Sequence, residues 1–238
     1  EELNSIQGDL QQWVSDPYQI LLRISDKGEV FEVRSAYAPD MVTAFIHLGG
    51  HAVGVVANRA AIYGDEGEVK EEFGTVLTEA GALKATRFVN MCDAFSIPII
   101  TLVNVESMAS SMNDEQRLPE RAGRLAFAFA NATTAKISVL TGYAYGTPYI
   151  IMNSRALGAD FIYSWKDAGV GAMKADMAAK VLSPSQDPAV LHQTAMLYRE
   201  LRDGAESAAA RGYVDTLIDP SETRKYLIGS LEMLYTKR

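Results

Sequence analysis

The segment at residues 136–152, which reads KISVLTGYAYGTPYIIM, restricts the possible folds of this chain more than any other segment. The apolar residues around Val139 have the composition of a buried β-strand. Gly142 and Gly146 then relax the backbone, and the apolar run resumes at Tyr149. A turn of this kind that leads into a helix leaves backbone N–H groups unpaired and directed at whatever lies above them. Because a purely structural strand-to-helix connection has the same pattern, the remaining sequence must decide whether the turn has a function.

The composition indicates one globular domain over residues 1–238. Nearly half of the residues are hydrophobic, at 48%, which is enough to bury a sizeable core. The net charge is −8, and no run of Lys and Arg forms a stripe that could follow phosphates, so we do not expect nucleic acid as a partner. The longest apolar runs are far shorter than the roughly 20 residues that a membrane-spanning helix needs. One cysteine, Cys92, and the lack of a signal peptide before Leu3 favour a cytoplasmic location.

Strand and helix patterns alternate through the middle of the chain. Two apolar stretches, residues 41–48 and 52–57, are separated by Gly49 and Gly50 and predict a β-hairpin. Thr78 can cap a helix whose apolar positions extend to Phe95 and include Cys92, and residues 99–105 are typical of a strand buried on both faces. This alternation predicts a mostly parallel sheet with crossover helices.

Weaker patterns give further expectations. We expect a short helix over residues 5–13 that Pro17 terminates, and a solvated loop over the charged residues 63–73. A loop over residues 106–119 should precede a helix over 121–132 that buries Leu125, Phe127, Ala128 and Phe129. A strand over 160–165, a helix over 172–182, a break at Pro184 and Pro188, and one long amphipathic helix over 189–211 complete the pattern.

The common catalytic motifs are absent from the sequence. His47, His51 and His192 are the only histidines, and none lies at metal-ligand spacing from another His, Cys or paired acid, so we expect no metal site. The sequence contains neither a GxSxG elbow nor a Walker lysine nor a dinucleotide fingerprint. If the chain is an enzyme, positioned backbone donors should therefore do its chemistry.

Four segments carry a resemblance to a known family. They read VTAFIHLGGHAVGVVANRA from Val42, GALKATRFVNMCDAFSIPIITLVNV from Gly81, ATTAKISVLTGYAYGTPYIIMNSRALGADFIYSW from Ala132, and ARGYVDTLIDPSETRKYL around Arg211. In this order, and at close to the family's spacing, these segments resemble the C-terminal half of biotin-dependent acyl-CoA carboxyltransferases. The resemblance covers nearly the whole chain from about Glu29 onward.

The resemblance implies a fold and a reaction. The fold is an α/β, crotonase-like (ClpP/crotonase) spiral of ββα units, with mostly parallel sheets and surrounding helices. Residues 1–238 would form a single C-terminal-type domain, and the N-terminal, acyl-CoA-binding half is absent from this chain. The reaction would transfer a carboxyl group between an acyl-CoA and biotin, present as carboxybiotin on a carrier protein. The implied partners are the biotin carboxyl carrier protein, biotin carboxylase, the N-terminal half and further copies of the chain, since family active sites lie between subunits.

The same resemblance suggests the site residues. The glycine pair and alanine of the family's YGGAY turn fall on Gly146, Thr147 and Pro148, and the backbone N–H groups of Gly146 and Thr147 are the candidate oxyanion donors. The family's two donors fall on Thr147 and Pro148, and because Pro148 has no N–H, one donor would be missing. Ile150 lies where carboxylases often have an acid, which would suit a different acyl group.

Two tyrosines, Tyr143 and Tyr145, flank the turn and could wall a biotin ring, although packing in the core is the commoner role of such residues. Together with Pro148 and Ile150 they are the candidate substrate-binding residues.

Three functions remain open at this stage. The first is a carboxyltransferase half, and the second is a biotin-dependent decarboxylase subunit of the same fold, which shares its transition state. The third is a divergent, non-catalytic subunit, suggested by Pro148 and by the loop from Glu106 to Ser111, which lacks the family's glycines. The acyl group, the direction of the reaction and the number of subunits also remain open.

Overall fold

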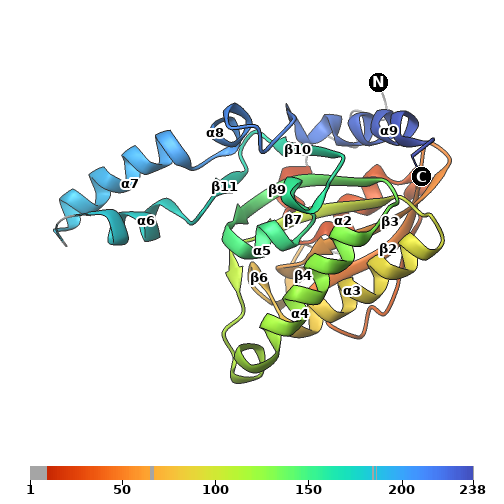
Figure 1. The fold of residues 1–238 in the computed structure, drawn as a ribbon, viewed down its shortest axis with the longest axis horizontal. Helices are drawn as coiled ribbons and strands as arrows, with labels where there is room; N and C mark the ends of the chain where they lie inside the picture. The colour runs from red at the N-terminus through yellow and green to blue at the C-terminus, as the bar shows by residue number, and fades with distance from the viewer. Residues whose placement is uncertain (1–9, 65–66, 184, 186, 238) are drawn as a thin grey trace.

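An eight-stranded mixed sheet forms the centre of the computed structural model, which describes residues 10–64, 67–183, 185 and 187–237 (Figure 1). Along the sheet the strands follow the order β1-β2-β3-β7-β9-β10-β12, and β11 pairs with β9. Their bounds are β1 (Val30–Glu32), β2 (Met41–Leu48), β3 (His51–Asn58), β7 (Ile99–Val105), β9 (Lys136–Tyr145), β10 (Phe161–Trp165), β11 (Gly169–Gly171) and β12 (Thr216–Ile218). All pairings from β3 onward are parallel, which confirms the mostly parallel sheet.

The antiparallel edge of the sheet is the hairpin that the sequence predicted. β2 and β3 pair from Met41 opposite Asn58 to Leu48 opposite His51. The two turn residues, Gly49 and Gly50, have φ values of 58° and 83°. Two consecutive positive φ angles favour glycine and match the twist of a tight hairpin, so this pair fixes the register.

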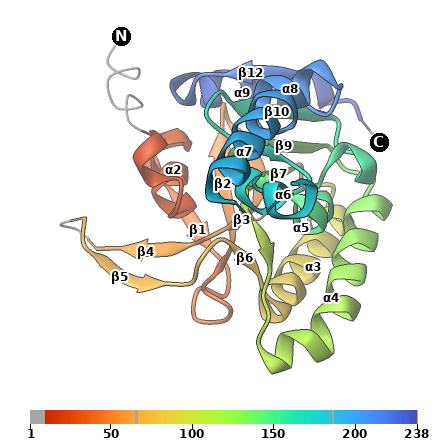
Figure 2. The ribbon, with the colours of Figure 1, turned by 90° about the vertical axis from the view of Figure 1, so that its left-hand side faces the viewer.

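Helices cover both faces of the sheet and bury two separate cores (Figure 2). One face carries α3 (Glu79–Ala94), α4 (Met112–Asn131) and α5 (Gly146–Ile151), and the other carries α2 (Pro17–Ile24) and α9 (Thr223–Leu234). In β7, Ile100 and Leu102 belong to one core while Ile99 and Val103 belong to the other. A strand that contributes to both cores needs apolar side chains on both faces, as its unbroken apolar run predicted.

The cap of α3 is also confirmed. The Thr78 hydroxyl accepts a hydrogen bond of 2.9 Å from the N–H of Gly81, and Cys92 is fully buried. Burial raises the pKa of the Cys92 thiol to about 12. Phe95, expected on the apolar face, lies instead just after the last helical residue and is largely exposed.

The start of α4 differs from the prediction. The helix begins at Met112 rather than at residue 121, because Ser111 caps it by accepting from the N–H of Asp114, and Pro119 lies inside it. An interior proline removes one helical hydrogen bond, and the burial of neighbours such as Leu118 compensates for that loss. Phe127, predicted to point inward, is exposed, whereas Leu125, Ala128 and Phe129 are buried as expected.

Two N-terminal expectations also need correction. Pro17 starts α2 instead of ending a helix, since a proline in the first turn loses no intrahelical bond. Of the helix predicted over residues 5–13, only η1 (Leu10–Trp13) falls within the described residues. The charged insert is not a loop throughout: it contains the exposed strand β5 (Val69–Glu72), which pairs with the partly buried β4 (Ala61–Tyr63), while residues 65 and 66 of the predicted loop lie outside the described residues.

The C-terminal part contains an arm of two helices, α6 (Ala175–Leu182) and α7 (Pro188–Arg202), that extends away from the sheet (Figure 1). The long helix expected over 189–211 is two helices, because Gly204 has a φ of 126° and separates α7 from α8 (Ala205–Ala210). The remaining short elements are β6 (Val76–Leu77), β8 (Ser107–Met108), η2 (Asp26–Gly28), η3 (Arg155–Leu157) and η4 (Pro220–Glu222). In the part of the chain that the structure describes, no helix combines the length and the apolar composition needed to cross a membrane.

Candidate functional site

The strand β9 passes into α5 without a loop. Tyr145 is the last strand residue, and Gly146, the first helical residue, has a φ of 57°. A Cβ atom at this position would lie 3.1 Å from the carbonyl oxygen of Ala172. Both the positive φ and the close approach require glycine, so Gly146 is what allows the strand to turn directly into the helix.

Thr147, the second residue of α5, has an N–H without an intrahelical acceptor. The first amides of a helix have no carbonyl one turn earlier to bond to. Within the described residues, no acceptor outside the helix lies within hydrogen-bonding distance of this N–H either. Pro148, at the third position, has no N–H to offer. The amide of Thr147 is therefore free for a ligand.

The amide of Gly146 faces the neighbouring strand. Successive amides of a strand point to opposite neighbours, and the N–H of Tyr143 donates to Asn104 Oδ1 of β7 over 3.0 Å. Three residues further on, the N–H of Gly146 faces β11, where Gly171 is the register partner of Tyr145. A ligand that bound this second amide would compete with the sheet for it.

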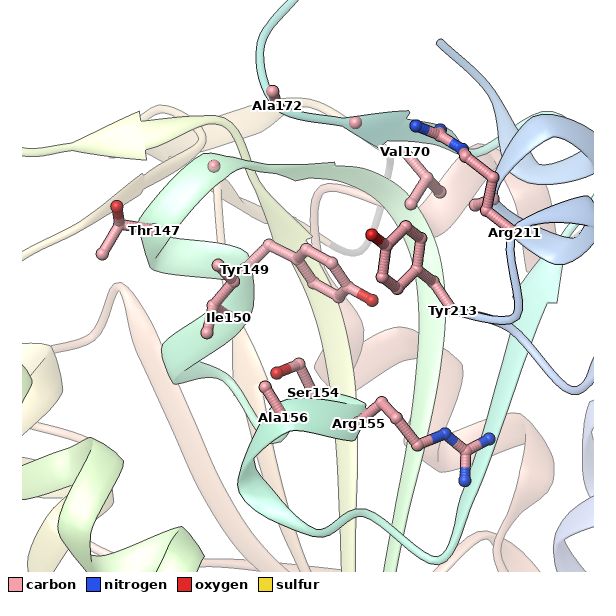
Figure 3. A pocket seen from close by; sticks show the side chains of 13 residues that line it. Thr147, Tyr149, Ile150, Ser154, Arg155, Ala156, Val170, Ala172, Arg211 and Tyr213 are labelled. Atoms are coloured by element: carbon pink, nitrogen blue, oxygen red, sulfur yellow. The ribbon is translucent and has the colours of Figure 1, made fainter. Parts of the chain in front are cut away.

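A pocket of about 630 Å³ opens beside these residues (Figure 3). Its walls come from residues 146–156, which include α5 and η3, from residues 170–172 at the end of β11, and from residues 208–213 in and after α8. The pocket lies past the carboxyl ends of β9 and β11, where α/β proteins commonly bind ligands.

Of the residues proposed from the sequence, Gly146, Thr147 and Ile150 line this pocket, and Ile150 is 44% exposed. Tyr143, Tyr145 and Pro148 do not belong to the lining.

The two tyrosines that flank the turn form a separate cluster. Tyr145 is buried, and its hydroxyl donates to Asp203 Oδ1 over 2.8 Å. Burial and this hydrogen bond raise the pKa of Tyr145. The ring of Tyr143 stacks against Tyr145, with centroids 5.8 Å apart, and the Lys174 ammonium lies 4.2 Å from the centroid of Tyr143.

Part of the pocket lining was not predicted from the sequence: Tyr149, Arg155, Arg211 and Tyr213. Ser154, which the sequence suggested either as a helix cap or as a residue that shapes the pocket, lines the pocket and makes no capping hydrogen bond. Tyr149 follows the turn closely and could have been found from that proximity. Arg211 and Tyr213 come from the distant GYVD segment, and only the three-dimensional fold brings them next to the turn.

The pocket is polar only at a few points, and these are hydroxyl or cationic groups. Burial raises the pKa of Tyr149 to about 12, so its hydroxyl stays protonated at neutral pH. Arg155 forms an ion pair with Asp215, while the described residues that line the pocket include no Asp or Glu. Anionic or hydrogen-bond-accepting ligands are therefore favoured over cationic ones.

A second pocket, of about 500 Å³, lies on the α4 side of α5, and Thr147 lines both. Met108 and Ala109, from the loop that lacks the family's glycines, line the second pocket. Glu106, at the start of that loop, pairs with Lys174 at 2.5 Å. In the described part of the chain, no group of three or more His, Cys, Asp or Glu residues is placed to hold a metal ion.

Known proteins are similar in sequence to this chain over most of its length. The methylmalonyl-CoA carboxyltransferase 12S subunit of Propionibacterium freudenreichii subsp. shermanii is 35% identical over 94% of this chain. The methylmalonyl-CoA decarboxylase subunit alpha of Veillonella parvula is 33% identical over 100% of it. The chain spans less than half of these relatives, 42% and 45% of their respective lengths.

Solved structures agree with the fold. The crystal structure of transcarboxylase 12S, described as a hexamer assembly with methylmalonyl-coenzyme A bound, matches with a TM-score of 0.85 at 35% identity over 94% of this chain and 42% of that one. The beta subunit of the P. aeruginosa geranyl-CoA carboxylase matches with a TM-score of 0.79 at 23% identity, over 94% of this chain and 42% of that chain, and supports the fold alone. The fold is crotonase-like, as expected. Residues 1–238 match the family described as Carboxyl transferase domain, and because this match covers the whole chain, the protein belongs to that family.

Proposed function

We propose that this chain is the carboxybiotin-binding half of a biotin-dependent acyl-CoA carboxyltransferase. The observation that carries the proposal is the free N–H of Thr147 at the edge of a pocket that is large enough for a small ring system. The relatives named as a methylmalonyl-CoA carboxyltransferase and a methylmalonyl-CoA decarboxylase support the same chemistry.

The pocket residues fit the task of such a half-site. Carboxybiotin, held on a carrier protein, would supply the carboxyl group that moves to the α carbon of the acyl group. In this chain, the N–H of Thr147 would donate to the ligand oxygen on which negative charge develops. Ile150 and Val170 offer apolar walls that exclude water and so strengthen this hydrogen bond. The amide of Gly146 would add a second donor only if the ligand displaced its strand neighbour.

The complete reaction requires partners. The acyl-CoA would bind in an N-terminal half of the kind that makes up the remainder of the relatives' length. A biotin carboxyl carrier protein and a biotin carboxylase would deliver and recharge the biotin. Several copies of the chain would assemble, as the hexamer in the transcarboxylase structure suggests.

Decarboxylation is the second candidate, because the Veillonella relative is named a decarboxylase subunit and matches the full chain. A third candidate, a subunit without catalytic activity, is favoured by Pro148, which removes one N–H from the first turn of α5.

A direct carboxyl-transfer assay separates these candidates. In one arm the chain is combined with the N-terminal half, a carboxybiotinylated carrier and an acyl-CoA acceptor, and the carboxylated acyl-CoA is measured. In the other arm it is combined with the N-terminal half, an uncarboxylated biotin carrier and a carboxylated acyl-CoA, and the CO2 released as carboxybiotin breaks down is measured. Formation of carboxylated acyl-CoA supports the transferase. Assembly without any turnover would leave only the non-catalytic subunit, and CO2 release that depends on carboxylated acyl-CoA would identify the decarboxylase.

A further inference from the structure

Three hydroxyl groups in the pocket beside Thr147 have no hydrogen-bond partner. Ser154 is 4% exposed, and its buried Oγ has no partner. Tyr149 is 9% exposed, and neither its hydroxyl nor that of Tyr213 forms a hydrogen bond with any described residue. Buried polar groups normally find partners, so the unpaired Ser154 Oγ indicates a ligand. The hydroxyls of Tyr149 and of Tyr213, which is 51% exposed, are available to the same ligand from the wall of the pocket.

These hydroxyls come from two parts of the chain. Tyr149 and Ser154 belong to α5 and the residues after it, and Tyr213 follows α8. Figure 3 shows the rings of Tyr149 and Tyr213 next to each other, and Ser154 below Tyr149 with its hydroxyl oxygen on the side away from the two rings. Tyr213 is also close enough to Tyr149 to affect the pKa of its hydroxyl. The two phenols therefore lie close together, and Ser154 lines the same pocket; we call these three residues the hydroxyl cluster.

The surroundings of the hydroxyl cluster favour a negatively charged ligand group. A phenol hydroxyl can donate a hydrogen bond, and no acidic side chain lines the pocket within the described residues. Arg211 uses its Nε and Nη2 atoms to hold the carbonyl oxygens of Ser207 and Arg202, at 3.0 and 3.1 Å, which leaves its Nη1 atom without a partner. Its charge at the wall of the pocket attracts an anion.

We propose that Tyr149, Ser154 and Tyr213 form a subsite that binds the carboxylate of the ligand, beyond the amide of Thr147. This rests on the proposed function, in which one substrate carries a carboxyl group. That carboxylate has two possible sources, an N-carboxylated ureido ring or a malonyl-type acyl group, and the same hydroxyls would recognise either.

Equilibrium binding to the intact chain tests the subsite without any need for turnover. The acyl source is probed with methylmalonate against neutral propionamide, and the ureido source with 2-oxoimidazolidine-1-acetate against neutral 2-imidazolidinone. We expect at least one anion to bind more tightly than its neutral partner, and the anion that does so identifies the source.

Variants then link this binding to the hydroxyls. Tyr149→Phe, Ser154→Ala and Tyr213→Phe each remove one donor with little change in shape, and each should weaken anion binding about tenfold, as expected for a hydrogen bond to a charged group. Tyr235→Phe, at an exposed tyrosine outside the pocket, is the matched control and should bind like the parent. Circular dichroism checks that every variant is folded.

The proposal fails if neither anion binds better than its neutral partner. It also fails if the three folded variants bind the anion as tightly as Tyr235→Phe. Failure of carboxyl transfer in the assay described above would overturn the proposed function but not a hydroxyl-dependent anion site, so the two results are distinguishable.

Discussion

Adjacent residues at the head of α5 have different tasks. Gly146 makes the turn possible through its positive φ, Thr147 offers a free amide N–H, and Pro148 has no N–H to offer. The sequence could indicate these three because they are contiguous and follow a recognisable strand. Tyr149 was missed, and the role of Ser154 was left open, because an unpaired hydroxyl is a property of the surroundings and not of the residue type. At the scale of single residues, sequence predicts backbone conformation and backbone hydrogen-bonding capacity better than it predicts side-chain contacts.

Replacing Pro148 with alanine restores an N–H to the first turn of α5. We expect kcat for carboxyl transfer to rise by up to about a hundredfold, since one oxyanion donor is worth about that much. Rate measurements at saturating substrate, compared with the parent chain in the same assembly, provide the test. An unchanged kcat would mean that the missing N–H does not limit the reaction.

Gly146→Ala should destabilise the fold and impair the site together. The left-handed backbone costs about 1–2 kcal/mol for a residue with a Cβ, and this Cβ would press on the carbonyl oxygen of Ala172. Urea unfolding measures the effect. The control is Gly229→Ala, inside α9, where a Cβ meets nothing within 4 Å and should raise stability by roughly 0.5–1 kcal/mol. Equal stability of the two variants would refute the strain at Gly146.

Among the elements, α4 differs most clearly from the helix that the sequence predicted. The expected start at residue 121 treated Pro119 as the end of a loop, yet Ser111 begins the helix earlier and Pro119 is tolerated inside it. The unfavourable effect of Pro119 on the helix is outweighed by the Ser111 cap and by the burial of Leu118 and Ala122. This burial depends on the packing of α4 against α3, which local sequence does not reveal. The break at Gly204 was missed for a related reason, because a glycine in a helical pattern reveals its φ only in the structure.

Removing the cap of α4 should have a measurable effect. Ser111→Ala loses the hydrogen bond from the N–H of Asp114 and should lower the free energy of unfolding by about 1 kcal/mol. Chemical denaturation of this variant is compared with Ser35→Ala, at an exposed serine outside any helix. If both variants unfold at the same denaturant concentration, the cap contributes nothing.

For the molecule as a whole, a buried lysine sets part of the pH dependence of stability. Lys84 of α3 is 1% exposed, and its ammonium donates to the carbonyl oxygen of Ala38 over 3.2 Å. Burial lowers its pKa from 10.5 to about 8. Between these two values the unfolded chain holds a proton that the folded chain has released, so stability rises with pH across this window and is lowest below pH 8.

Lys84→Met removes this titration. Between pH 7 and pH 9.5 the parent chain should gain about 2 kcal/mol of unfolding free energy relative to the variant, which follows from the two pKa values by linkage. Urea unfolding of both chains at the two pH values measures the difference. A parallel pH dependence of parent and variant would show that Lys84 does not titrate in this range.

The overall architecture was the most predictable level. The hairpin, the doubly buried β7 and the parallel order depend on apolar patterns that local sequence displays directly. Only half of the pocket was predictable. Its residues within 146–156 lie next to the turn in the sequence, whereas those within 208–213 reach the pocket only because the chain returns to the sheet after the arm of α6 and α7.

The pocket wall formed by residues within 208–213 comes late in the sequence, which has a consequence for biosynthesis. A nascent chain that has left the ribosome only as far as α5 already contains the free amide but has no enclosed space around it. We therefore expect a chain truncated before residue 208 to lack this wall of the pocket, together with the sheet strand β12, and to bind the proposed ligand poorly.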